Sequence, residues 1–209
     1  MKMRFALLSL LTICLLAAVP ALADTTLYSS GTTTGTANAY NIGTGHLVVS
    51  DKFTLTNPSS IESLSIVYWD TSKTDYLKTV DMEISSSYLP SSGFQTLTAV
   101  SNTILNGGNI NGHGNYEFQA DFTFTGIDWA AGSGWITLKN ATCVTTGCTL
   151  SWDMNGATPT AWDFNGTTTK SINGETFTLD GDTPEPSSLL LLGSGLLGLA
   201  GMLRLKLAR

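Results

Sequence analysis

The sequence feature that most constrains the fold is a strict alternation of apolar and polar residues over 116–125. Tyr, Phe, Ala, Phe and Phe occupy every second position, and Glu, Gln, Asp and two Thr fill the positions between them. Side chains of a β-strand point alternately to two faces, whereas a helix would spread these aromatic residues around its circumference. The segment therefore predicts a strand with one buried face and one solvent-exposed face.

Other segments follow the same rule, with polar turns between them. Val80, Met82 and Ile84 alternate with polar residues, and five Asn-Gly pairs, which favour tight turns, separate segments of this kind. Further predicted strands are 25–28, 46–56, 61–69, 94–105, 134–143, 148–154, 160–164 and 175–179. Because this region shows no sustained helical period, we expect an all-β domain, an antiparallel β-sandwich or jelly roll.

The N-terminus has the pattern of a secretory signal. Lys2 and Arg4 precede a mostly apolar segment over 5–19, and Ala21-Leu22-Ala23 offers small residues at a cleavage site. We expect a signal helix over 1–23 that signal peptidase removes, so that the mature chain begins at Asp24.

The C-terminus has three parts in order. Pro184-Glu185-Pro186 favours an extended conformation, residues 187–203 carry no charge, and a basic end follows. A helix of that uncharged length spans roughly 26 Å, which is enough for a short membrane helix. The basic end favours a cytoplasmic C-terminus.

This tail resembles the PEP-CTERM protein-sorting tail of bacterial exported proteins. The resemblance implies that an exosortase, a membrane transpeptidase-like protein, recognises the tail and cleaves near Pro184, Glu185 and Pro186. The label "ice-binding protein C-terminal domain", also given to this tail, names the sorting signal and implies no activity. The expected organisation is a signal peptide at 1–23, a β-sandwich domain at 24–182 and a sorting tail at 183–209. The protein is then exported, held briefly in the membrane by the C-terminal helix, and delivered to the cell surface or the extracellular space.

The composition of residues 24–182 limits the partners of the domain. This region holds five lysines, no arginine and fifteen acidic residues. An acidic surface without arginine argues against binding nucleic acid or anionic lipid. It suits solubility, cation binding or a neutral sugar partner such as an extracellular polysaccharide.

Cys143 and Cys148 are the two cysteines of the mature chain, with four residues between them. In an exported protein this spacing predicts a disulfide across a hairpin turn. A redox or metal-binding pair is the alternative, but neither Cys-x-x-Cys spacing nor a nearby histidine supports it.

A short repeat places tryptophan beside aspartate. Trp152-Asp153 and Trp162-Asp163 each begin a Trp-Asp-x-Asn-Gly segment, and Trp69-Asp70 is a partial echo. One interpretation is two hairpin arms with tryptophan in the core. The other is a carbohydrate site, in which Trp69, Trp152 and Trp162 stack on sugars while Asp153 and Asp163 bind hydroxyls. We expect no cofactor, although Asp153-x-Asn155 and Asp163-x-Asn165 offer oxygen ligands for Ca²⁺.

We find no catalytic constellation. The chain has two histidines, His46 and His113, and lacks the Gly-x-Ser-x-Gly nucleophile motif. Carboxylates beside tryptophan, at Asp70, Asp153 and Asp163, are the candidates for a glycoside hydrolase pair. We therefore expect a non-enzyme with a structural or adhesive role in the envelope or in an extracellular polysaccharide matrix. A non-catalytic carbohydrate-binding module is the alternative, and a secreted hydrolase is the third class.

Overall fold

The computed structural model describes residues 25–183, except 34, 36, 146 and 157–159, together with Gly193. The described residues form thirteen strands and one short 3₁₀ helix, which confirms the predicted all-β class. The signal helix expected at 1–23 and the membrane helix expected at 187–203 lie outside the described residues, apart from Gly193. The elements are β1 (Thr25–Ser29), β2 (Ala39–Asn41), β3 (Val48–Leu55), β4 (Ser59–Asp70), β5 (Leu77–Ser85), β6 (Gln95–Thr98), β7 (Ser101–Ile104), η1 (Asn106–Gly108), β8 (Tyr116–Trp129), β9 (Gly132–Cys143), β10 (Ser151–Asp153), β11 (Ala161–Phe164), β12 (Thr169–Ile172) and β13 (Phe177–Asp182).

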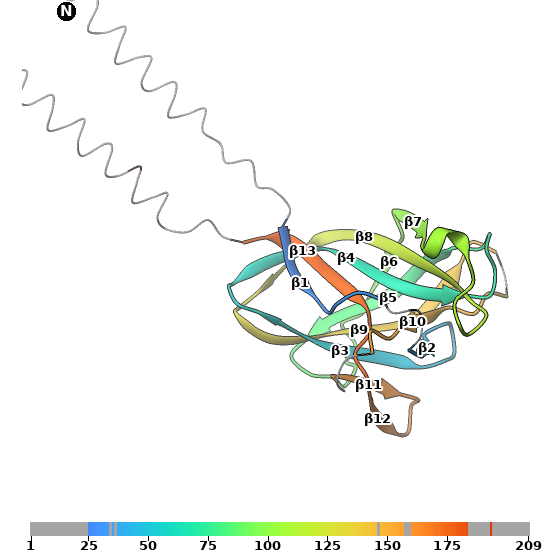
Figure 1. Cartoon of the computed structure of the whole chain (residues 1–209). Helices are drawn as coiled ribbons and strands as arrows, with labels where there is room; N and C mark the ends of the chain where they lie inside the picture. The colour runs from blue at the N-terminus through green and yellow to red at the C-terminus, as the bar shows by residue number, and fades with distance from the viewer. Residues whose placement is uncertain are drawn as a thin grey trace, which may run out of the picture.

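The strands form two antiparallel sheets (Figure 1). In the first sheet β4 is central: β8 pairs along one edge, and β13 and then β10 pair along the other. Beyond these lie β7 next to β8, β1 next to β13 and β2 next to β10. The second sheet has the order β12-β11-β3-β9-β5-β6.

Both sheets contribute to one core. On β8 the expected alternation is present, because Phe118, Ala120 and Phe122 are fully buried while Thr123 is exposed. Glu117 departs from the pattern: we expected it on the polar face, but it is almost fully buried. The apolar faces of the two sheets thus pack against each other, as in the predicted β-sandwich.

Three segments differ from the predicted strands. The single strand expected at 94–105 is two strands in different sheets: β6 pairs with β5, and β7 pairs with β8. The chain passes between the layers at Ala99 and Val100. β2 and β12 were not predicted, because strands of three and four residues are too short to display a periodic pattern.

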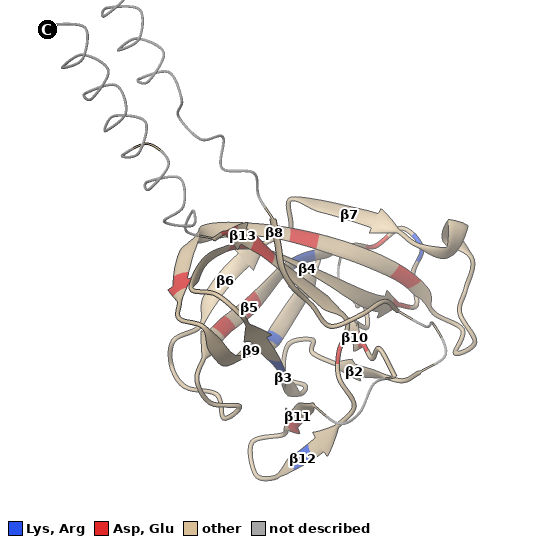
Figure 2. Ribbon diagram, turned by 60° about the vertical axis from the view of Figure 1, so that its left-hand side comes forward, with Lys and Arg blue, Asp and Glu red and all other residues tan. Residues whose placement is uncertain are grey.

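The two ends of the domain lie side by side. Thr25 at the start of β1 pairs with Gly181 near the end of β13. Gly181 has φ of 157° at a bulge, and a Cβ there would collide with the backbone oxygen of Ser60, so the close approach needs glycine. The β11–β12 hairpin projects from the side of the domain away from these chain ends (Figures 1 and 2).

Candidate functional site

The predicted carbohydrate-site tryptophans do not share one surface. Trp152 is fully buried between the sheets, where its Nε1 donates to the Thr176 carbonyl at 3.0 Å and its ring meets Phe177 edge-on. Trp69 is also buried, with its ring 5.0 Å from that of His113. Trp162 alone of the three is partly exposed. Two of the three indoles therefore pack inside the protein and are not available to stack on a sugar.

Trp162 belongs to a different group, an outer aromatic patch formed by Tyr88, Trp135 and Trp162. Trp162 stacks on Tyr88 with centroids 4.7 Å apart, and Trp135 meets Tyr88 at 5.6 Å. All three are partly exposed on the outer face of the second sheet, because their neighbours Ala161 and Ile136 face the core. Sequence reasoning missed the patch, although the alternation of 134–143 already placed Trp135 on the polar face.

The loop that carries Tyr88 is held against this face. The Ser50 hydroxyl donates to the Tyr88 carbonyl at 2.9 Å. The Ser91 amide donates to Glu83 at 3.0 Å, and the Ser91 hydroxyl also donates to Glu83. The patch is thus held in place by hydrogen bonds to β3 and β5 as well as by ring contacts.

Asp153 and Asp163 belong to an acidic seam, which we define as Asp51, Asp153, Asp163 and Glu175. Asp51, Asp153 and Glu175 have no exposed surface. Asp51 lies on β3 between the core residues Val49 and Phe53, and Glu175 lies two residues before the start of β13. Red acidic segments appear at β10 and β11 in Figure 2. The seam therefore joins residues of both sheets.

Some oxygens of the seam are hydrogen-bonded and others are not. Asp51 accepts from the Lys52 amide at 2.6 Å and from the Glu175 amide at 2.7 Å. Asp153 accepts from the Thr176 hydroxyl at 2.9 Å, but its Oδ1 has no hydrogen-bond partner of good geometry. Both carboxylate oxygens of Glu175 are buried without a partner. Unpartnered buried carboxylates are costly, so this region is the least satisfied polar part of the described structure.

Burial dominates the electrostatics of the seam. It raises the pKa of Asp51 to about 6, in spite of the hydrogen bonds that favour the charged form. Burial likewise raises the pKa of Asp153 to about 6, with a further contribution from the charge of Glu117. Burial, followed by the charges of the other three seam residues, raises the pKa of Glu175 well above its ordinary value. Within the described residues, no lysine or histidine offsets these shifts.

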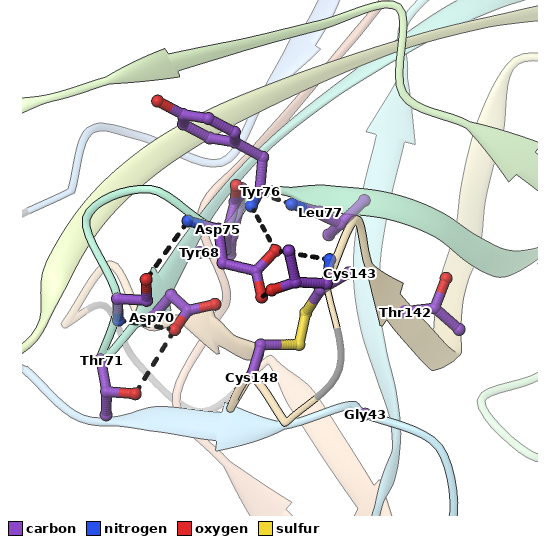
Figure 3. The surroundings of a disulfide bond; sticks show 12 residues. Gly43, Tyr68, Asp70, Thr71, Asp75, Tyr76, Leu77, Thr142, Cys143 and Cys148 are labelled. Carbon is purple, nitrogen blue, oxygen red and sulfur yellow. Dashed lines mark hydrogen bonds between the residues drawn. A yellow bond between two sulfur atoms is a disulfide. The ribbon is translucent and has the colours of Figure 1, made fainter.

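Cys143 and Cys148 form the predicted disulfide, with Cα atoms 6.3 Å apart (Figure 3). Asp70 lies beside it, buried and with Oδ2 unpartnered. Metal ions in proteins are commonly bound by histidine, cysteine, aspartate and glutamate. Within the described residues, Asp70 and the two cysteines are the one group of three side chains of these types whose ligand atoms lie within 4.8 Å of one another. Because the two sulfurs are bonded to each other, neither is a thiolate, and a metal ion has no sulfur ligand here.

The candidate hydrolase carboxylates are placed apart. Asp70 lies at the disulfide, whereas Asp153 and Asp163 lie in the acidic seam. A separate pocket lies where the chain leaves the domain. Its lining includes Pro58, Asp128, Trp129, Asp182 and Thr183, none of which was a predicted site residue.

The sorting residues Pro184, Glu185 and Pro186 lie outside the described residues. Among the residues that are described, no helix is long and apolar enough to cross a membrane. In a comparison with protein families, the PEP-CTERM protein-sorting motif matches residues 182–204, which confirms the resemblance seen in the sequence. This motif marks an exported protein that an exosortase processes. No curated protein and no solved structure matches the chain.

Proposed function

We propose that this exported, exosortase-sorted protein is a structural or adhesive component of the cell surface or the extracellular polysaccharide matrix, and that its β-sandwich acts without catalysis. The single observation that carries the proposal is the position of the two chain ends. Thr25 pairs with Gly181, so the signal-peptide side and the sorting-motif side leave the domain at one end. The motif match begins at residue 182, directly beyond this pair.

This arrangement suits a module displayed from a surface. While the tail holds the protein, the end that carries the chain termini faces the membrane. The β11–β12 hairpin then projects from the side of the domain away from the attachment (Figure 1). The buried state of Trp69 and Trp152 supports a role for these residues in stability.

The sorting step is tested by replacing Pro184, Glu185 and Pro186 together with alanine. We expect the full-length chain to accumulate in the membrane fraction, measured by immunoblotting of cell fractions and culture medium. A matched control replaces Ser187 and Ser188 with alanine, which leaves the three-residue motif intact and should leave processing normal. Normal release of the Pro-Glu-Pro variant would contradict the assignment.

A second candidate function is carbohydrate binding at the outer aromatic patch, because Tyr88, Trp135 and Trp162 present partly exposed rings on one face. Aromatic faces stack on sugar C–H groups. We expect Trp162→Ala to abolish retardation of the protein in gels that contain matrix polysaccharide. Leu89→Ala, an exposed apolar change in the same loop as Tyr88, is the control and should migrate as the wild type. Equal migration of the wild type with and without polysaccharide would dismiss this candidate.

A further inference from the structure

We propose that Glu175 is protonated in the folded domain, so that folding takes up a proton and the domain is more stable in mildly acidic surroundings than at neutral pH. The proton acts whatever the domain binds, so its effect is independent of the proposed adhesive role. An exported domain meets the pH of its surroundings directly. Such a group therefore makes the stability of the domain respond to external acidity.

The main chain around Glu175 holds its side chain inside the protein. The Glu175 amide donates to Asp51 Oδ2 of the second sheet at 2.7 Å, and the Glu175 carbonyl accepts from Asn155 Nδ2 at 3.3 Å. On the side of the first sheet, the amide of the next residue, Thr176, donates to the Asp153 carbonyl at 2.7 Å. Because the backbone is held from both sheets, the carboxyl group cannot turn out to water without breaking these bonds.

The carboxyl group of Glu175 has no partner to balance a negative charge. It is fully buried, and neither of its oxygens has a hydrogen-bond partner. Burying an ionised carboxylate without a partner costs far more than burying the neutral acid, so such a group takes up a proton instead. The neutral form is therefore the one that this environment favours.

The titratable groups around Glu175 are acidic. Those that act on it directly or are acted on by it come from four strands, and they are Asp51 of β3, Asp153 of β10, Asp163 of β11 and Tyr40 of β2. Beyond them, Glu117 of β8 acts on Asp153, and Asp51 acts on Tyr28 of β1. Lys52 follows Asp51 and Lys170 pairs with Asp163 across β11 and β12, but both lysines are exposed. Within the described residues, no cation counters the charges that act on Glu175.

The pH range of the effect follows from the carboxyl groups of the seam. Burial, followed by the charges of Asp51, Asp153 and Asp163, raises the pKa of Glu175 well above its ordinary value. A carboxyl group whose pKa rises on folding stabilises the folded state fully below its pKa in the unfolded chain, about 4, and this stabilisation is lost as the pH rises through the pKa of the folded state. Asp51 and Asp153, whose pKa values are about 6, account for the loss up to that pH, and Glu175 extends it to higher pH.

Ionisation of Glu175 acts where the two sheets are joined. The bond from its amide to Asp51 links the segment before β13, in the first sheet, to β3 in the second. A second negative charge beside Asp51 weakens the contact between the layers at this point. Trp152 reports on the contact, because its Nε1 donates to the carbonyl of the neighbouring Thr176 at 3.0 Å.

The test compares the exported wild type with Glu175→Gln, whose side chain has the same shape and does not ionise. Urea unfolding is followed by tryptophan fluorescence at intervals from about pH 5 to about pH 8. For each proton taken up on folding, the folding equilibrium constant of the wild type should fall about tenfold per pH unit. The variant should lose one proton's share of that fall above about pH 6, and it should be more stable than the wild type at about pH 8. Glu62→Gln, on β4 outside the seam and partly exposed, is the matched control and should keep the wild-type profile.

A measurement on the wild type alone decides the matter if the variant does not fold. Calorimetric unfolding at about pH 7, in two buffers of different ionisation enthalpy, should show about one proton released per chain. Where the variant does fold, the Trp152 indole proton should exchange with solvent faster in the wild type than in Glu175→Gln at the same alkaline pH.

The proposal is overturned if the wild type releases no proton on unfolding. It is also overturned if the pH profile of Glu175→Gln equals that of the wild type, or if Glu62→Gln changes the profile as much as Glu175→Gln does. CaCl₂ at about 5 mM, above the range in which extracellular calcium modules bind, should leave the wild-type profile unchanged. Loss of the pH dependence under that condition overturns the proposal, because a bound cation then balances the charge of Glu175.

Discussion

Replacing both Cys143 and Cys148 with serine should destabilise the protein by a modest and calculable amount. The disulfide joins residues five positions apart, so it closes a small loop in the unfolded chain. The chain-entropy relation gives about 2 kcal/mol for a loop of this size. For a domain of this length, that loss should lower the unfolding midpoint by roughly 4–8 °C.

The fold itself should survive this change. The corner around the disulfide keeps hydrogen bonds that do not involve sulfur (Figure 3). The Thr145 amide donates to Asp75 Oδ1 at 3.0 Å, the Thr145 hydroxyl also donates to Asp75, and the Val144 amide donates to the Tyr76 carbonyl at 3.0 Å. These contacts hold the loop in both forms, which is why we expect a loss of stability and no rearrangement.

Urea unfolding monitored by tryptophan fluorescence measures the difference. Dithiothreitol should lower the stability of the wild type to that of the double variant, while leaving the variant unchanged. A variant as stable as the oxidised wild type would refute the reasoning, because the loop restriction would then contribute nothing. A loss above about 5 kcal/mol would refute it in the other direction, because entropy alone does not supply so much.

Two further changes test packing and charge. Gly134→Ala should lower the free energy of unfolding by about 1–3 kcal/mol, because the new Cβ meets the rings of Phe53 and Trp129. The control is Gly112→Ala, whose Cβ enters open space, and it should change the free energy of unfolding by no more than about 0.5 kcal/mol. Urea unfolding measures both values. Burial opposes ionisation of Asp121, but three side-chain hydrogen bonds outweigh it and hold its pKa below the ordinary value; the donors are Ser101, Gln119 and Ser65. A carboxylate whose pKa is lowered on folding stabilises the folded state above about pH 4, and this stabilisation is lost as the pH falls through the pKa of the folded state. The Asp121→Asn variant should therefore be less stable than the wild type at pH 7. The difference in stability between the two proteins should disappear at acidic pH.

The strands that alternate were predictable because their period reports directly which side chains meet the core. The inward position of Asp51 was also readable, since Val49, Asp51 and Phe53 share one parity within a predicted strand. The burial of Glu117 was not readable, because Gly35, which is distant in the sequence, lies against its carboxylate. A contact between residues so far apart in sequence leaves no local pattern.

The Trp-Asp-x-Asn-Gly repeat shows the same limit. Its two copies differ in sequence at one position, yet Trp152 faces the core while Trp162 faces outward beside Tyr88. Asn155 donates to the carbonyls of Ser30 and Glu175, whereas Asn165 accepts from the Thr167 amide and closes a turn. Which face of a strand meets the core depends on its partners in the sheet, and β10 pairs with β4 whereas β11 pairs with β3. Identical motifs therefore had different environments.

The disulfide ties the stability of the domain to its compartment. Disulfides persist outside the reducing cytosol. Before export the chain lacks the loop restriction that joins Cys143 to Cys148. The folded state should therefore be less stable inside the cell than outside it. That difference suits a chain that must cross the membrane unfolded and become stable only after the crossing.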